Sequence, residues 1–189
     1  MVKLRQLIAG LMTATVLVSS TTPVDAQKRP VGVGSLGEMS CQGIENGNYR
    51  VINKDFPIRM QIFRGIAKFF NDSDFTIYTK NNAAQVVCRL TGAGQIPKYR
   101  TLNLAFGIAD NDKRANGSLV RLSIYRDGNP YQYKDVTKGQ LLRWPIDVTN
   151  VRSIALEVEC LKGAEDKTVI MANNEDYCPA LIFFEDILQ

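Results

Sequence analysis

Histidine is absent from the 189 residues of this chain. Its absence excludes Ser-His-Asp and Cys-His catalytic arrangements, histidine-ligated metal sites and a histidine pH switch. Neither sign of charge is in large excess, because 23 Lys and Arg residues stand against 19 Asp and Glu residues. A net charge of +4, spread evenly along the chain, does not favour nucleic acid as a partner. The hydrophobic fraction of 45% and the charged fraction of 22% are those of an ordinary folded domain.

Hydrophobic runs long enough to span a bilayer are also lacking. A helix that spans a bilayer needs about 20 apolar residues. The most apolar stretch, residues 7–18, comes after Lys3 and Arg5. Further along, residues 24–26 (Val-Asp-Ala) have small side chains at their first and last positions. A short positive region, an apolar region and a small-residue cleavage site are typical of a secretory signal peptide. We therefore expect residues 1–26 to be a cleaved signal peptide of bacterial type. The mature protein would be secreted or periplasmic, with no transmembrane segment after cleavage.

Cysteine is limited to four residues, all in the part expected to be exported: Cys41, Cys88, Cys160 and Cys178. An even number in an exported chain predicts two disulfides, for which three pairings are possible. We favour Cys41–Cys88 and Cys160–Cys178, which join neighbours along the sequence. A zinc site is not expected, because the chain has no Cys-x-x-Cys pair and no histidine.

Three segments alternate apolar and other residues with a period of two: residues 102–108, 120–125 and 154–160. This period predicts strands that are buried on one face. Asp127 and Gly128, a turn-forming pair, follow the second segment and lead into Tyr131 and Tyr133, which predicts a hairpin.

Shorter patterns complete an all-β prediction. Further strands are expected at four segments: residues 74–79, 85–90, 141–148 and 180–184. One helix is expected at residues 58–70, where apolar residues recur at near-helical spacing. Residues 27–44, which are rich in Gly near their middle, are expected to form a flexible N-terminal arm. The alternative for residues 27–39 is a loosely docked first strand. Many short strands at close intervals predict a two-sheet jelly-roll β-sandwich over residues 45–189.

The sequence also resembles a known family. The resemblance rests on residues 106–112 (FGIADND), 116–128 (NGSLVRLSIYRDG) and 144–158 (WPIDVTNVRSIALEV). A strand ending in Gly-x-Asp, a Gly-Ser strand ending near Asp-Gly and a strand of the form I-D-V-T-x-V-x-x-I-x-L-x-V are similar to the novel carbohydrate-binding module family. That family has the galactose-binding-like jelly-roll fold, so the resemblance implies this fold and a carbohydrate ligand.

A secreted, non-catalytic, lectin-like module is therefore the favoured hypothesis, with a polysaccharide or glycan as its partner. The alternative is an envelope-associated protein that uses the sandwich to bind another protein and has no sugar ligand. An enzyme is not expected. Glu157 and Glu159 share an outward strand face about 7 Å apart, but such a face is not a cleft and no acid/base constellation is assembled.

Sugar recognition needs an aromatic face and neighbouring planar polar groups. The candidates crowd around one predicted hairpin and the next strand: Tyr125, Arg126, Tyr131, Tyr133 and Arg143. The competing interpretation is that the aromatic residues pack in the core or at its rim, and the parity of Trp144 with its apolar neighbours favours burial there.

No cofactor is expected, with one possible exception. Asp110 and Asp112 lie in a predicted loop and offer oxygen atoms of the kind that calcium binds. The loop lacks the full Asp-x-Asp-x-Asp-Gly pattern, so a plain solvated turn is the competing interpretation.

Overall fold

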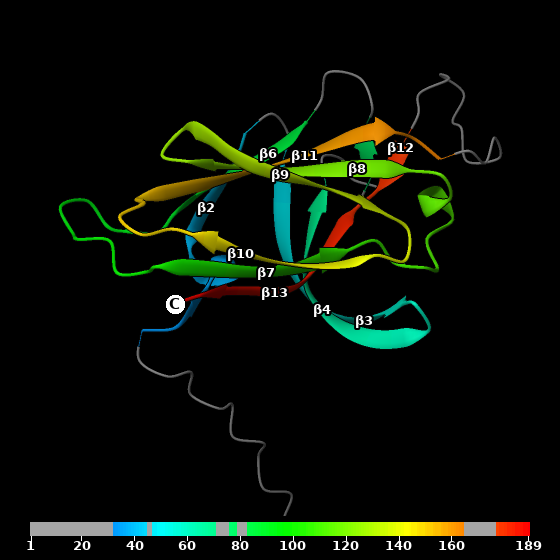
Figure 1. The fold of residues 1–189 in the computed structure, drawn as a ribbon, viewed down its shortest axis with the longest axis horizontal. Coiled ribbons are helices and arrows are strands. Elements are labelled where there is room, and N and C mark those ends of the chain that lie inside the picture. Colours follow the sequence, from blue (N-terminus) through cyan, green and yellow to red (C-terminus); the bar gives the residue numbers. More distant parts are fainter. Residues whose placement is uncertain (1–31, 45–46, 71–75, 79–82, 165–176) are drawn as a thin grey trace, which may run out of the picture.

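The chain folds as a sandwich of two antiparallel sheets (Figure 1), described by a computed structural model for residues 32–44, 47–70, 76–78, 83–164 and 177–189. We name the sheets by their places in Figure 1. The lower sheet has the strand order β10-β7-β13-β4-β3, and β1 pairs with β13 beside it. Its strands are β1 (Gly34–Ser35), β3 (Asn48–Ile58), β4 (Gln61–Phe70), β7 (Thr101–Gly107), β10 (Leu141–Asp147) and β13 (Leu181–Leu188).

The upper sheet has the order β2-β6-β11-β8-β9. Its strands are β2 (Ser40–Ile44), β6 (Ala84–Arg89), β8 (Leu119–Arg126), β9 (Asn129–Thr137) and β11 (Ser153–Lys162). A small sheet pairs β5 (Thr76–Tyr78) with β12 (Tyr177–Pro179). The described helical turns are the short 3-10 helices η1 (Leu36–Glu38) and η2 (Lys113–Ala115).

The core lies between the two sheets and is built by the alternation seen in the sequence. Every second residue of β8 and β11 is buried, and the residues between them are half-exposed. Trp144, only 5% exposed, packs against Phe106 from the lower sheet. The burial of this side chain agrees with its parity in the sequence, so it belongs to the core.

The helix expected at residues 58–70 is wrong. The structure has a hairpin there, in which β3 and β4 are joined at Arg59 and Met60. Both turn residues have positive φ, 49° and 64°, as a tight hairpin turn requires. Burial of Gly65, Ala67 and Phe69 follows a period of two, and β4 pairs on both sides, so sheet formation overrides the near-helical spacing.

The flexible arm expected at residues 27–44 also needs correction over residues 34–44. Residues 27–31 lie outside the described part of the chain. From residue 34 onward the segment belongs to the sandwich, because β1 pairs with β13 and β2 pairs with β6. Leu36 is fully buried between these strands, which gives the segment an apolar anchor.

Both disulfides join the pairs favoured from the sequence. Cys41 and Cys88 are direct partners across β2 and β6, with Cα atoms 4.0 Å apart. Cys160 of β11 is joined to Cys178 of β12, with a Cα–Cα distance of 5.5 Å. The first disulfide fastens an edge strand to the upper sheet, and the second ties the small sheet to the same sheet.

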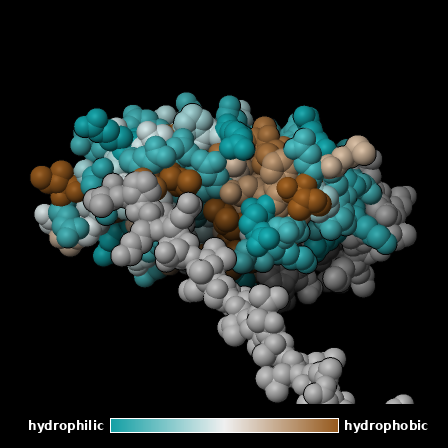
Figure 2. Space-filling model, turned by 90° about the horizontal axis from the view of Figure 1, so that it is seen from below, coloured by the Kyte–Doolittle hydropathy of each residue, from teal (hydrophilic) through white to brown (hydrophobic). Residues whose placement is uncertain are grey.

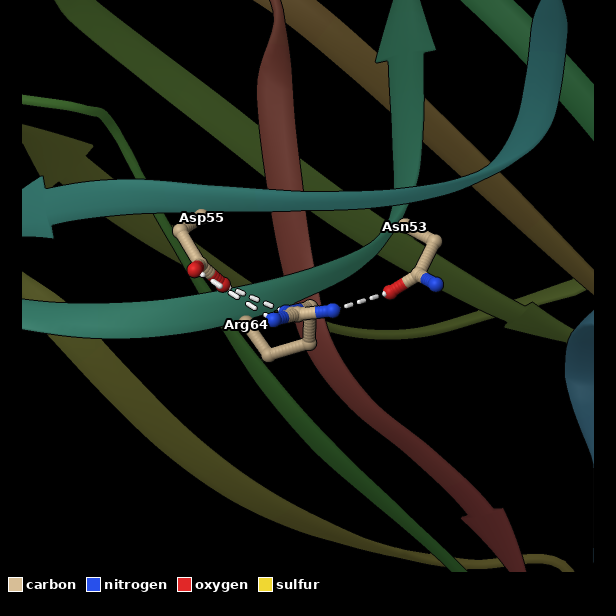
Figure 3. Close-up of polar contacts among 3 residues, drawn as sticks. All are labelled: Asn53, Asp55 and Arg64. Atoms are coloured by element: carbon tan, nitrogen blue, oxygen red, sulfur yellow. Dashed lines mark hydrogen bonds and ion pairs between the residues drawn. The ribbon is translucent and has the colours of Figure 1, made fainter. Parts of the chain in front are cut away.

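Three polar side chains of the β3–β4 hairpin form an exposed hydrogen-bonded cluster at the β3 edge of the lower sheet (Figure 3). Arg64 of β4 donates to both carboxylate oxygens of Asp55, and its Nη1 donates to Oδ1 of Asn53 at 2.6 Å. Two of the partners therefore lie on β3 and one on β4. Since the arginine and aspartate side chains are about half exposed, the ion pair adds little to stability and mainly orders the hairpin surface.

A buried carboxyl group ties the N-terminal segment to the lower sheet. Asp186 of β13 is 2% exposed. It accepts hydrogen bonds from the Ser35 hydroxyl at 2.6 Å, the Gly37 backbone N–H at 2.9 Å and the Tyr49 hydroxyl at 2.9 Å. Burial, reinforced by the charge of Asp186, raises the pKa of Tyr49 well above its usual value. One carboxyl group thus holds β1, η1 and β3 together.

We expect Tyr49→Phe to lower the free energy of unfolding by about 1–3 kcal/mol, because it leaves a buried acceptor with one donor fewer. Tyr133→Phe is the matched control, since Tyr133 is 57% exposed, and it should change stability by less than about 0.5 kcal/mol. Chemical denaturation of both variants measures the difference. Equal effects of the two substitutions would contradict the role assigned to the Asp186 network.

Candidate functional site

The outer face of the upper sheet presents four rows of side chains, which we call the platform. The rows follow from the pairing of β2, β6, β11, β8 and β9. They are Ser40–Arg89–Ser153, then Gln42–Val87–Ala155–Tyr125, then Ile44–Gln85–Glu157–Ser123–Tyr133, and finally Glu159–Arg121–Asp135. Because alternate residues of the central strands β6, β8 and β11 point to the core, the residues of these rows lie on the outer face.

Tyr125 lies on the platform, because it alternates with the buried residues of β8. Its hydroxyl donates to Oε1 of Glu157 at 2.8 Å, and the Gln85 side-chain amide donates to Oε2 of the same carboxylate. Partial burial, with the hydrogen bond to Glu157, raises the pKa of Tyr125 to about 12. Three neighbouring strands thus contribute to one ordered cluster of an aromatic ring, an amide and a carboxylate.

Tyr133 is the most exposed tyrosine of the platform. Its side chain is 57% exposed, and the guanidinium of Arg121 lies 4.0 Å from its ring centroid. Arg121 also donates to both oxygens of Asp135, at 2.8 and 3.0 Å, and this hydrogen bonding raises its pKa. The ring is therefore supported by a guanidinium that is itself fixed, which leaves an oriented aromatic surface.

Arg126 and Tyr131 are not part of the platform. The guanidinium of Arg126 lies 3.9 Å from the ring centroid of Tyr131, and its Nη1 donates to the backbone carbonyl of Asp147 at 3.1 Å. Tyr131 also packs against the core. Since Asp147 ends β10 of the lower sheet, this pair closes one edge of the sandwich.

Arg143 lies on the other sheet. It is an exposed residue of β10, next to the buried Trp144, and its Nη1 lies 3.1 Å from Oε2 of Glu185 on β13. The sequence placed Arg143 with the tyrosines because β10 follows the hairpin along the chain. In the fold, the strand after β9 changes sheets, so Arg143 faces away from the platform.

The loop at residues 110–112 does not fit calcium. Asp112 caps η2 and spends both carboxylate oxygens on Arg114, at 2.9 and 2.8 Å. Among the described residues, no three Cys, Asp or Glu side chains come together as a metal site would require. Because Asp112 is engaged by Arg114, the loop does not offer Asp110 and Asp112 together as ligands for a cation.

A pocket of about 370 Å³ opens at the first row of the platform. It lies where the loop after β6 meets the start of β11, toward the left of the upper sheet in Figure 1. Its polar lining is formed by Ser40, Gln42, Arg89, Thr91, Arg152 and Ser153. None of these was a candidate from the sequence. The sequence predicted a strand at residues 85–90, but the pairing of that strand with β2 is not visible in a single sequence.

Comparison with solved structures identifies the same fold in carbohydrate-binding modules. The structure of CBM51-2 and INT domains from Clostridium perfringens ZmpB has a TM-score of 0.54 and 16% identity, covering 82% of this chain and 31% of that chain. CBM51 from Clostridium perfringens GH95, in complex with methyl-galactose, has a TM-score of 0.52 and 10% identity, covering 83% and 99%. The chain thus spans about a third of the first protein and nearly all of the second.

No protein-family model matches the sequence, and no curated protein matches it. The likeness therefore concerns the fold. It confirms the two-sheet jelly-roll β-sandwich that the sequence predicted. Within the described ranges, the chain forms no helix with the length and apolar character needed to cross a membrane.

The raised pKa of Tyr125, caused first by partial burial and then by its hydrogen bond to Glu157, makes stability depend on pH in the alkaline range. The pKa of Tyr125 is raised from 10.0 to about 12 in the folded protein, so folding favours the protonated phenol. The contribution is full below the unfolded value and is lost as the pH rises toward the folded value. We expect the stability difference between the wild type and Tyr125→Phe to be constant up to about pH 10 and to shrink above it. Thermal melts at several pH values measure this, and a difference that does not change up to pH 12 would contradict it.

Proposed function

We propose that this chain is an exported, non-catalytic module that binds a carbohydrate on the platform. The observation that carries the proposal is the exposed, guanidinium-supported ring of Tyr133, in the same row as the fixed polar groups of Gln85 and Glu157. A pyranose offers an apolar C–H face for such a ring and hydroxyl groups for such planar partners.

The hydrogen bonds among the platform side chains support this role. Glu157 accepts from Tyr125 and Gln85, and Asp135 accepts twice from Arg121. These side chains are already ordered before a ligand arrives, so a ligand would lose less entropy in fixing them. The affinity of one module is expected to be modest, because the hydroxyls of the sugar must give up water.

The comparisons support the proposal through the fold only. A neighbour of similar fold is described in complex with methyl-galactose, and others are named as carbohydrate-binding modules. A fold can host many functions, so the choice of ligand depends on the platform residues themselves. The two disulfides are consistent with an extracellular or periplasmic location.

Tyr133→Ala tests the proposal directly. We expect it to raise the dissociation constant for a glycan found on an array at least about tenfold, which corresponds to about 1.4 kcal/mol, because the stacking surface is lost. Arg143→Ala is the matched control, since Arg143 is 69% exposed on the opposite sheet. Calorimetry with the oxidised protein measures both constants. The platform is the wrong site if Arg143→Ala weakens binding as much as Tyr133→Ala does.

The lower sheet favours the second candidate function, binding of a protein partner. Its β3–β4 hairpin exposes Val51 by 62%, Met60 fully and Ile62 by 67%. Figure 2, which views this side, shows apolar side chains in patches separated by hydrophilic ones. A folded protein that binds no glycan on the array would favour this second function over the first.

A further inference from the structure

We propose that the pocket at the end of the platform binds the carboxylate of a uronic acid, so that the glycan ligand of this chain is an acidic polysaccharide. This inference rests on the proposed function and adds the chemical class of the ligand. Arg89 and Arg152 both line the pocket, and each is exposed there.

The position of Arg89 follows from the strand register. Arg89 is the last residue of β6, and its Cα partners are Ser40 of β2 and Ser153 of β11. The side chains of Ser40, Arg89 and Ser153 therefore lie side by side on the outer face, with the guanidinium of Arg89 between the two serine hydroxyls. Arg152 directly precedes Ser153, and its backbone carbonyl accepts from the Leu90 N–H at 2.9 Å. This bond holds the ends of β6 and β11 together, so both arginines are anchored at the pocket mouth.

The charges at this end of the platform are not balanced. Within the described ranges, no carboxylate lies within ion-pair distance of the side chain of Arg89 or Arg152. Asp127, at the turn between β8 and β9, is an acidic residue that bonds to this end of the platform. Its Oδ1 accepts from the backbone N–H groups of Arg152 and Ser153 and from the Ser153 hydroxyl, at 2.8 to 3.2 Å. The Asp127 carboxylate thus joins the β8–β9 turn to the start of β11. The guanidinium groups of Arg89 and Arg152 remain for a ligand.

A carboxylate is the group that this lining recognises best. A planar guanidinium can bind a carboxylate through two parallel hydrogen bonds, which is stronger and more selective than binding to a neutral hydroxyl. The hydroxyls of Ser40 and Thr91 and the amide of Gln42 line the same pocket and suit the remaining hydroxyls of a sugar ring. The volume of about 370 Å³ lies in the range of small-molecule sites.

The pocket lies one row away from Tyr125 in the strand register. Ser153 is two residues from Ala155, the Cα partner of Tyr125. Two residues along a strand and one strand across amount to roughly 8 Å. The floor between them is formed by the short side chains of Val87 and Ala155. An oligosaccharide could therefore place one acidic residue in the pocket and extend over Tyr125 toward Tyr133.

The test compares acidic oligosaccharides with their neutral methyl esters. Oligomers of galacturonate, glucuronate and mannuronate, and the methyl ester of each, are titrated into the oxidised protein in buffer of low salt. We expect at least one acid to bind at least tenfold more tightly than its ester, and this preference to weaken as sodium chloride is added. Arg89→Gln and Arg152→Gln should each reduce the preference for that acid by about tenfold. Arg143→Gln, which removes the same charge from the other sheet, should leave it unchanged.

The outcomes separate this inference from the proposed function. If acids and esters bind equally, or only neutral glycans bind, the uronate pocket is wrong and the carbohydrate-binding function stands. If Arg143→Gln lowers the preference as much as the pocket variants do, the effect is one of overall charge and the pocket is again wrong. If none of these oligomers and no glycan of the array binds, the proposed function fails and the inference fails with it.

Discussion

One constraint governs both the core and the candidate site: the central strands of the upper sheet, β6, β8 and β11, each give one face to the core. In β8 and β11 the buried positions are nearly fully enclosed, including Leu122 and Leu156 at 0% exposure. A shift of register by one residue would move these side chains into water and bring polar ones inside, so the register is strongly fixed. The intervening residues are then fixed as well. The platform rows are made of the residues that alternate with the buried ones. The packing of the core therefore determines the order of these rows.

The platform also depends on how its edge strand is held. β2 has only β6 as a neighbour in the upper sheet, yet it supplies Ser40 and Gln42 to the pocket. The Cys41–Cys88 disulfide joins β2 to β6 at the position between these two residues. Just before β2, the Asp186 network anchors η1 to the lower sheet. The start of β2 is therefore held from both layers of the sandwich, which keeps the first two rows of the platform in place.

The sequence was informative where local patterns determine the structure. Alternation predicted the strands around Leu104, Leu122 and Leu156, and the Asp127-Gly128 turn forms the expected hairpin, with positive φ at both residues. It failed at residues 58–70, where near-helical spacing competed with a period of two and only pairing with β13 and β3 decides between them. Of the candidate site residues, Tyr125 and Tyr133 share the platform, and their role in binding stays a prediction. Arg143 was misplaced and Arg89 was missed, because both depend on which strands become neighbours, and a single sequence does not contain that information.

The hydrogen bonds of the platform favour the proposed binding function. A general acid or base needs a carboxyl group that can approach a substrate and exchange a proton. Glu157 has both oxygens engaged by Tyr125 and Gln85, and Asp135 has both engaged by Arg121. These carboxylates act as acceptors that orient other side chains. The cationic groups at the pocket are different, because their backbones are anchored by strand pairing while their guanidinium groups still face solvent. An ordered polar and aromatic surface with unbalanced positive charge at one end is suited to holding an extended acidic chain in a single direction.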